Sequence, residues 1–329
     1  MDRRVFLQGL GALPLAACAS GLVSGPAMAQ ANWPTRASNM IVPFPPGGQA
    51  DLAARPVANA LTSILGQPVV VENKGGAGGA IGNGLAAKAA PDGYTMLMTL
   101  SSLAVLPEAA RISGRQPTYE MSQLQPIARV LADPTVLVVP ASAPWKTVAD
   151  LVADAKARPG KIQYGSSGLY GTTHVSMAMF TTAAKIDMLH VPYQGGGPSL
   201  TALVAGEVQA IASAPGPLKP FLDKVRVLAC FGAQRAPAFP DAPTFQELGY
   251  KDVEFYIWAG LFLPVGVPKP VQEKLGAAVK TAVQSPDVVR ILENAGSPPA
   301  YMDEAQFTAF VAADSARLVK AVQAIGKVE

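Results

Sequence analysis

Two segments of this chain, about 120 residues apart, share one design, and this repeated design most constrains the fold. The first is Ile41–Asp51 and the second is Ile162–His174. Each reads as a short strand, a glycine-containing loop and the start of an apolar-striped helix. Such a loop exposes backbone N–H groups, and the helix N-terminus adds a partial positive charge, so both favour an anion. The sequence therefore predicts two lobes that grip one small acid between them.

Length and composition allow such a two-lobed protein. The chain has 329 residues, of which 50% are hydrophobic and 15% charged. This is enough for two ordinary domains with real cores and argues against disorder. The formal net charge is +3, and removal of Asp2, Arg3 and Arg4 (net +1) leaves +2. Without a basic run or a basic-aromatic stripe, nucleic-acid binding is not expected.

Residues 1–29 are predicted to be an export signal. Arg3-Arg4 followed by an apolar stretch is a twin-arginine pattern, and Ala27-Met28-Ala29 is a small-x-small cleavage site. In an alternative interpretation, Leu15-Ala16-Ala17-Cys18 is a lipoprotein processing site that would leave Cys18 lipidated. No later segment reaches the roughly 20 apolar residues that span a bilayer. We therefore expect a periplasmic protein.

Strands and helices alternate along most of the chain, which favours sheets covered by helices. The fold class predicted is α/β: two lobes, each a mostly parallel sheet flanked by helices, with the ligand cleft between them. The first lobe is assigned 30–131 and 255–329, and the second 132–254. Strands are expected at 39–44, 69–72, 94–100, 135–139, 162–165, 188–191, 208–212 and 222–231, and helices at 51–65, 80–89, 147–157, 173–184, 198–205, 271–282, 286–295 and 303–318.

An ordered set of motifs resembles the Bug receptors, the extracytoplasmic solute-binding proteins of the tripartite tricarboxylate transporters. The motifs are Pro43-Phe44-Pro45-Pro46-Gly47-Gly48 with Asp51, Ala54-Arg55, Leu65-Gly66-Gln67-Pro68, Gly76-Ala77-Gly78-Gly79, Pro91-Asp92-Gly93-Tyr94, Tyr164-Gly165-Ser166-Ser167-Gly168, Val191-Pro192-Tyr193, Gly195-Gly196-Gly197-Pro198 and Pro240-Asp241-Ala242-Pro243-Thr244. The resemblance covers nearly all of residues 39–329. It implies a type II periplasmic-binding fold hinged by two crossovers, a small carboxylate ligand, and a membrane transporter or a sensor kinase as partner. A monomer is expected.

Candidate ligand-binding residues come from the two loops and from the carboxyl ends of nearby strands, where α/β proteins bind ligands. They are Phe44, Gly47, Gly48, Ser101, Ser102, Gly165, Ser166, Ser167, Thr172, Tyr193, Gly195 and Ser213. Hydroxyl and N–H groups suffice to hold an oxyanion. Asp51 is expected to cap a helix or to pair with Arg55, because its carboxylate would repel an acid.

Other chemistries fit the residues less well. A serine hydrolase would use Ser166 or Ser167, but Gly-Ser-Ser-Gly is not the nucleophile-elbow pattern, and a structural role is favoured for His174. No cluster has metal-ligand spacing, Cys230 lies in an apolar run, and the glycines at 75–84 fail the dinucleotide context. No catalytic residue, metal or cofactor is therefore expected.

One departure from the family pattern concerns the ligand. The family often has Asp where this chain has Gln209, after Gly206-Glu207-Val208. By resemblance, loss of an acidic side chain there favours an acid without an amino group, provided that Gln209 faces the ligand.

Overall fold

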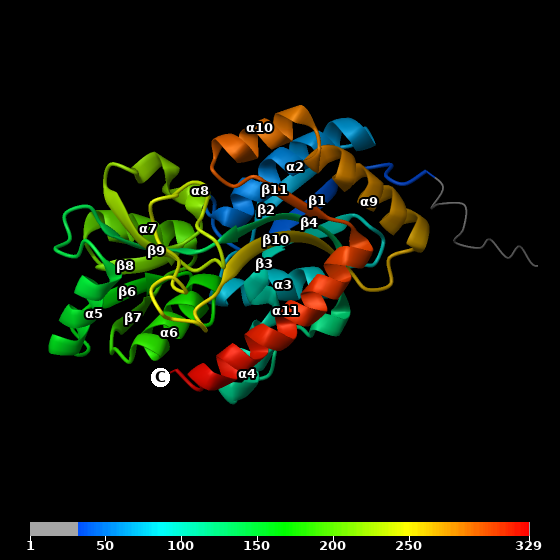
Figure 1. The fold of residues 1–329 in the computed structure, drawn as a ribbon. Coiled ribbons are helices and arrows are strands. Elements are labelled where there is room, and N and C mark those ends of the chain that lie inside the picture. Colours follow the sequence, from blue (N-terminus) through cyan, green and yellow to red (C-terminus); the bar gives the residue numbers. More distant parts are fainter. Residues whose placement is uncertain (1–31, 329) are drawn as a thin grey trace, which may run out of the picture.

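The computed structural model describes residues 32–328, which form two α/β lobes side by side (Figure 1). The predicted export signal at 1–29, with its twin-arginine pattern and Cys18, lies outside the described residues. Between residues 32 and 328, no helix is both long enough and apolar enough to cross a membrane.

One lobe contains a six-stranded sheet with the strand order β11-β4-β10-β3-β1-β2. Its strands are β1 (Ser38–Val42), β2 (Val69–Asn73), β3 (Thr95–Leu100), β4 (Leu124–Pro134), β10 (Tyr256–Pro264) and β11 (Pro299–Met302). Helices α2 (Gln49–Leu65), α9 (Lys269–Val283) and α10 (Pro286–Asn294) cover one face (Figure 1). Helices α3 (Ala80–Ala87), α4 (Leu106–Ile112) and α11 (Glu304–Ile325) cover the other.

The other lobe contains a five-stranded sheet with the strand order β7-β6-β8-β5-β9. Its strands are β5 (Val136–Pro140), β6 (Gln163–Ser166), β7 (Leu189–Pro192), β8 (Ala210–Ser213) and β9 (Val225–Cys230). Helices α5 (Val148–Ala157) and α6 (Thr172–Ala184) lie on one face, and α7 (Gly196–Ala205) with the short α8 (Pro215–Leu218) on the other (Figure 1).

The two-lobed α/β fold is confirmed, but the expectation of mostly parallel sheets is wrong in detail. Pairings β1–β2, β1–β3, β6–β7 and β6–β8 are parallel, whereas β4, β10, β11 and β5 pair antiparallel with their neighbours. Strands β4 and β10 were not predicted. They pair antiparallel with each other, and no single crossover helix connects them. The alternation of strands and helices, which indicates parallel pairing, therefore could not reveal them.

The predicted helix ends are confirmed by their capping groups. Gly66 ends α2 in the left-handed conformation at φ 69°, which glycine adopts without cost. Thr147 caps α5 in a reciprocal capping box with Asp150, and Asp303 caps α11 in the same way. These local signals explain why helix positions could be predicted closely.

Three segments of the chain meet where the lobes join. The Thr135 N–H donates to the Phe255 carbonyl at 3.1 Å, the Phe231 N–H to the Thr135 carbonyl at 2.8 Å, and the Phe255 N–H to the Phe231 carbonyl at 2.9 Å. Thr135 separates β4 from β5, and Phe231 and Phe255 lie between β9 and β10. The chain therefore passes between the sheets twice at one place.

The C-terminal segment makes a further contact between the lobes. Helix α11 packs on the first sheet and ends near α6 of the second lobe (Figure 1). Beyond its end, the buried Tyr170 hydroxyl donates to the Gly326 carbonyl at 2.8 Å and accepts from the Val328 N–H at 2.9 Å. Tyr170 lies two residues before α6, so the C-terminal segment is tied to the second predicted loop.

Candidate functional site

A small cavity of about 30 Å³ lies between the lobes and brings the two predicted loops together. Five of the predicted residues line it: Phe44, Gly48, Ser167, Thr172 and Ser213. The other lining residues are Pro45, Gln49, Ala50, Leu100, Thr173, Gly196, Ala214, Pro217 and Ile257. This volume has room for about two water molecules, so the lobes are closely apposed here.

Three helices begin at the small cavity. Helix α2 starts after Gly48 in the first lobe, and α6 and α7 start after Gly171 and Gly195 in the second. In all three the residue before the helix supplies no side-chain cap. In the first turn of α6 the Thr173 N–H donates to Ser167 Oγ at 3.5 Å. Within residues 32–328 no side chain caps the other first N–H groups of the three helices, and the helix dipoles place partial positive charge around the cavity. Because none of its lining residues is acidic, the cavity is suited to an anion.

Asp51 lies in the first turn of α2, but its carboxylate is bound within the first lobe. Arg55 donates to both of its oxygens at 2.9 Å, as predicted, and the Gly47 N–H donates to it at 3.2 Å. Burial by itself raises the pKa of Asp51, but hydrogen bonds from Arg55, Asn73 and Gly47 outweigh burial and lower it. The Gly47 N–H is therefore already hydrogen-bonded. The N–H groups of this loop that a ligand can use are those of Gly48 and the first turn of α2.

Hydroxyl groups of the second lobe complete the lining. The Ser167 N–H donates to Thr173 Oγ1 at 2.7 Å, and the Thr173 hydroxyl donates to Ser167 Oγ at 3.1 Å. The Ser213 hydroxyl donates to the Ala214 carbonyl at 3.0 Å. Within residues 32–328 the buried Thr172 hydroxyl makes no hydrogen bond. Thr172 and Ser167, whose hydroxyl accepts from Thr173 but donates to no group within residues 32–328, are the side-chain donors of the second loop that a ligand can use without breaking an existing contact.

Ser166, the neighbour of Ser167, faces away from the small cavity. Its Oγ lies 2.6 Å from His190 Nε2, and His190 stacks on His174 with ring centroids 4.1 Å apart. The Tyr170 N–H donates to His174 Nδ1 at 2.9 Å, so His174 has the structural role that was expected. Burial lowers the pKa of His190 to about 4, and burial with the neighbouring His190 lowers the pKa of His174 to about 3. Both rings are therefore neutral at pH 7.

Four other predicted residues lie near the small cavity without lining it. Ser101 is buried in the turn after β3, and its Oγ has no partner within the described residues. The Ser102 hydroxyl donates to the Gly78 carbonyl at 3.3 Å. Gly165 is inside β6, where a Cβ would lie 2.7 Å from Ser199 Oγ. Gly195 directly precedes α7 at φ 154°.

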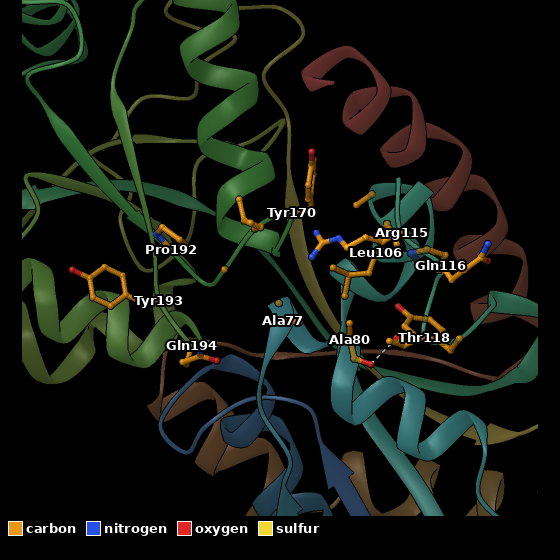
Figure 2. A pocket seen from close by; sticks show the side chains of 17 residues that line it. Ala77, Ala80, Leu106, Arg115, Gln116, Thr118, Tyr170, Pro192, Tyr193 and Gln194 are labelled. Atoms are coloured by element: carbon orange, nitrogen blue, oxygen red, sulfur yellow. Dashed lines mark hydrogen bonds between the residues drawn. The ribbon is translucent and has the colours of Figure 1, made fainter. Parts of the chain in front are cut away.

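Tyr193, the remaining predicted residue, lines a larger cavity of about 410 Å³ (Figure 2). This cavity also lies between the lobes, because residues 77–119 of the first lobe and residues 168–170 and 192–194 of the second line it. The Tyr193 hydroxyl donates to Glu207 at 3.2 Å.

Gln49, in the first turn of α2, lines the small cavity and was missed in the sequence. Its amide Nε2 donates to Asp133 Oδ2 and, at 3.1 Å, to Ser297 Oγ. Asp133 is buried, with 4% of its surface exposed. Burial raises its pKa to about 7, although hydrogen bonds from Ser297 and Gln49 oppose the shift. These three residues are 84 and 164 positions apart along the chain, and no local pattern joins them.

Gln209 lies away from both cavities. Its Oε1 accepts from the Gln163 N–H at 2.8 Å, and its own N–H donates to the Gln163 carbonyl. Both residues are at the amino ends of β8 and β6, opposite the ends that reach the small cavity. Gln209 therefore does not face the candidate site, and it gives no ground for expecting an acid without an amino group.

Within residues 32–328, no group of three or more metal-ligand side chains occurs. Cys230 is buried, and burial raises the pKa of its thiol, which disfavours the reactive thiolate.

The sequence matches a known family over most of its length. The profile of the TctC family, described as "Tripartite tricarboxylate transporter family receptor", matches residues 53–327. The chain belongs to this family. The predicted resemblance is thereby confirmed, and with it the class of protein: a periplasmic solute-binding receptor.

Solved structures agree with this assignment. The periplasmic binding protein BugD is 30% identical, with a TM-score of 0.84 over 89% of this chain and 98% of that one. Rpa4515 of R. palustris, solved with adipate, is 30% identical, with a TM-score of 0.83 over 89% and 98%. MatC of Rhodopseudomonas palustris, with bound malate, is 28% identical, with a TM-score of 0.81 over 88% and 100%.

Proposed function

We propose that this receptor captures a small carboxylate at the small cavity and performs no chemistry on it. The observation that carries the proposal is the convergence of three helix N-termini from both lobes on a cavity lined by neutral hydroxyl groups and no acidic side chain. The candidate ligand contacts are Gly48, Thr172 and Ser213, with the first N–H groups of α2, α6 and α7. The carboxylates bound by the adipate and malate receptors support this ligand class.

Capture proceeds by hinge closure. A ligand that touches both lobes binds the closed arrangement more tightly and shifts the population toward it. The first loop lies close to the start of α7 in the other lobe, since a Cβ on Gly197 would lie 3.4 Å from the Pro46 carbonyl oxygen. We propose the predicted lobes, residues 30–131 with 255–329 and residues 132–254. We move the first boundary to Thr135, because β4 continues in the first sheet to Pro134.

The closed receptor then presents the acid to a tripartite tricarboxylate-type transporter. A sensor kinase that reads the same closed form is the alternative partner, and a monomer suffices for either. A pull-down of the mature protein that recovers a kinase ectodomain but no transporter subunit would favour the alternative.

Among residues 32–328, the Ser166–His190 pair resembles a nucleophile and its base. Ser166 is fully buried, and neither residue lines either cavity. We propose that the pair fixes the second loop. Hydrolysis of ester or amide substrates by the purified protein, abolished in Ser166→Ala, would contradict this assignment.

Thermal unfolding of the mature protein with mono-, di- and tricarboxylates, aromatic acids, amino acids and nucleotides tests the function. A ligand at 100 times its Kd should add about 2.7 kcal/mol of stability. We expect Thr172→Val to weaken binding of the active acid about tenfold by removing a hydroxyl donor, whereas Thr281→Val on the exposed face of α9 should leave it unchanged. Stabilisation by nucleotides alone, or by nothing in the panel, would contradict the proposal.

A further inference from the structure

The larger cavity between the lobes has no assigned role, and its size and position are those of a ligand site. Its volume of about 410 Å³ lies in the range of small-molecule sites, whereas the small cavity holds little more than a carboxyl group. A longer acid held at the small cavity must therefore place its remaining atoms elsewhere.

The two cavities are neighbours along the second lobe. Ser167 lines the small cavity and Gly168 the larger one, while Gln194 and Gly196 flank Gly195 in the same manner. Where they adjoin, the backbones of Gly78 and Gly168 meet: a Cβ on Gly168 would lie 3.1 Å from Gly78 N. These two glycines belong to opposite lobes, so a slight separation of the lobes would join the cavities.

Arg115 gives the larger cavity its chemical character. It is the single charged residue among those that line either cavity, and it is exposed. Figure 2 shows its side chain extending from the region after α4 into the space between the lobes. Arg111, four residues earlier, is held by Glu108 and Glu120, but Arg115 makes no ion pair within residues 32–328. Its guanidinium is available for a second anionic group.

The remaining lining is suited to the body of an organic acid. Ala77, Ala80, Leu106, Ala110 and Leu169 present apolar surface, and the polar side chains of Gln116, Thr118 and Gln194 lie at its margins. In Figure 2 Ala77 and Ala80 lie on the first-lobe side, opposite Tyr193 and Gln194 of the second lobe.

We propose that the larger cavity is the distal subsite of the receptor, and that Arg115 selects acids with a second carboxylate at the far end of an apolar body. This inference rests on the proposed capture of a first carboxylate at the small cavity. It narrows the ligand class from small carboxylates in general to elongated dicarboxylates.

Calorimetric titration of the mature protein with hexanedioate and hexanoate, which share the six-carbon chain, tests the subsite. We expect the diacid to bind about tenfold or more tightly than the monoacid. Arg115→Gln should remove this preference and leave the monoacid affinity within about twofold. Arg111→Gln removes the same charge one helical turn away and should keep the preference.

A second variant tests whether the ligand occupies the larger cavity, without a change of charge. Ala110→Leu fills part of the larger cavity and should weaken both six-carbon acids while sparing acetate. Equal loss of diacid and monoacid binding in Arg115→Gln, or two diacids bound per chain, would overturn the distal subsite and leave capture of a carboxylate standing. Absence of binding by every carboxylate of the thermal-unfolding panel, these two acids included, would overturn the proposed function itself.

Discussion

Individual side chains in the candidate site take their roles from which way they point. Ser166 and Ser167 are adjacent in sequence and chemically identical, yet Ser166 contacts His190 and Ser167 lines the small cavity. Successive residues of an extended strand point to opposite faces, so one of two neighbouring serines necessarily turns away from a given site. The sequence identified the pair, and the geometry at the end of β6 assigned the roles.

The buried carboxyl group of Asp133 predicts how the stability of the protein depends on pH. Its folded-state pKa of about 7 lies above the ordinary value of 3.8 because the carboxyl group is buried. Between about pH 4 and pH 7 the folded protein holds a proton that the unfolded chain has lost, so this group makes stability fall as pH rises through that window. We expect Asp133→Asn to remove this fall, because the asparagine Oδ1 can still accept from Gln49.

The measurement is the free energy of unfolding in urea at pH 4, 6 and 8. Asp133→Asn should match the parent at pH 4 and exceed it at pH 8 by up to about 4 kcal/mol, the value of three pKa units. Exposed Asp241→Asn serves as the control and should follow the parent at every pH. A constant difference between Asp133→Asn and the parent across this range would show that Asp133 does not titrate as described.

The candidate site is formed by the N-terminal ends of three helices. Glycines precede α2, α6 and α7, and glycine lets the backbone approach closely without a side chain. The strand–loop–helix pattern predicted the first two starts from local sequence. Their meeting at one cavity depends on the closed arrangement of the lobes, to which no local signal points.

Gly168→Ala tests the contact between the second loop and Gly78 of the first lobe. Gly168 has φ 111° and lies against Gly78 of the other lobe, whereas Gly206 has φ 80° with nothing near its Cβ position. Both substitutions should lower stability by roughly 1 kcal/mol, because alanine is strained at positive φ. Only Gly168→Ala should also weaken acid binding, by tenfold or more, because its methyl group would hold the lobes apart.

The comparison requires titration of both variants with the same acid after thermal unfolding confirms that each is folded. Equal affinities in Gly168→Ala and Gly206→Ala would show that the Gly78–Gly168 contact is not part of closure.

The molecule as a whole is held closed by contacts that join distant parts of the chain. The crossings at Thr135 and between Phe231 and Phe255 set the hinge, and the end of α11 reaches Tyr170 beside the second loop. Closure over a ligand should therefore both compact the protein and engage the C-terminal segment.

Tyr170→Phe tests that engagement. Loss of the hydroxyl removes the hydrogen bonds to Gly326 and Val328, so we expect a larger radius of gyration without ligand in small-angle scattering and about fivefold faster ligand dissociation. Tyr250→Phe is the matched control, since the Tyr250 hydroxyl makes no hydrogen bond within residues 32–328. Identical scattering and dissociation for the two variants would remove the C-terminal segment from the closing mechanism.

The sequence by itself determined the two-lobed α/β class, most helix boundaries and the positions of the two strand–loop–helix segments, because periodicity, caps and glycine loops act within a few residues. It did not predict β4 and β10, the Gln49–Asp133–Ser297 cluster or the cavity that holds Arg115. Those features join residues from distant parts of the chain. Long-range strand pairing and the apposition of the lobes created them, and only the tertiary structure decides these contacts.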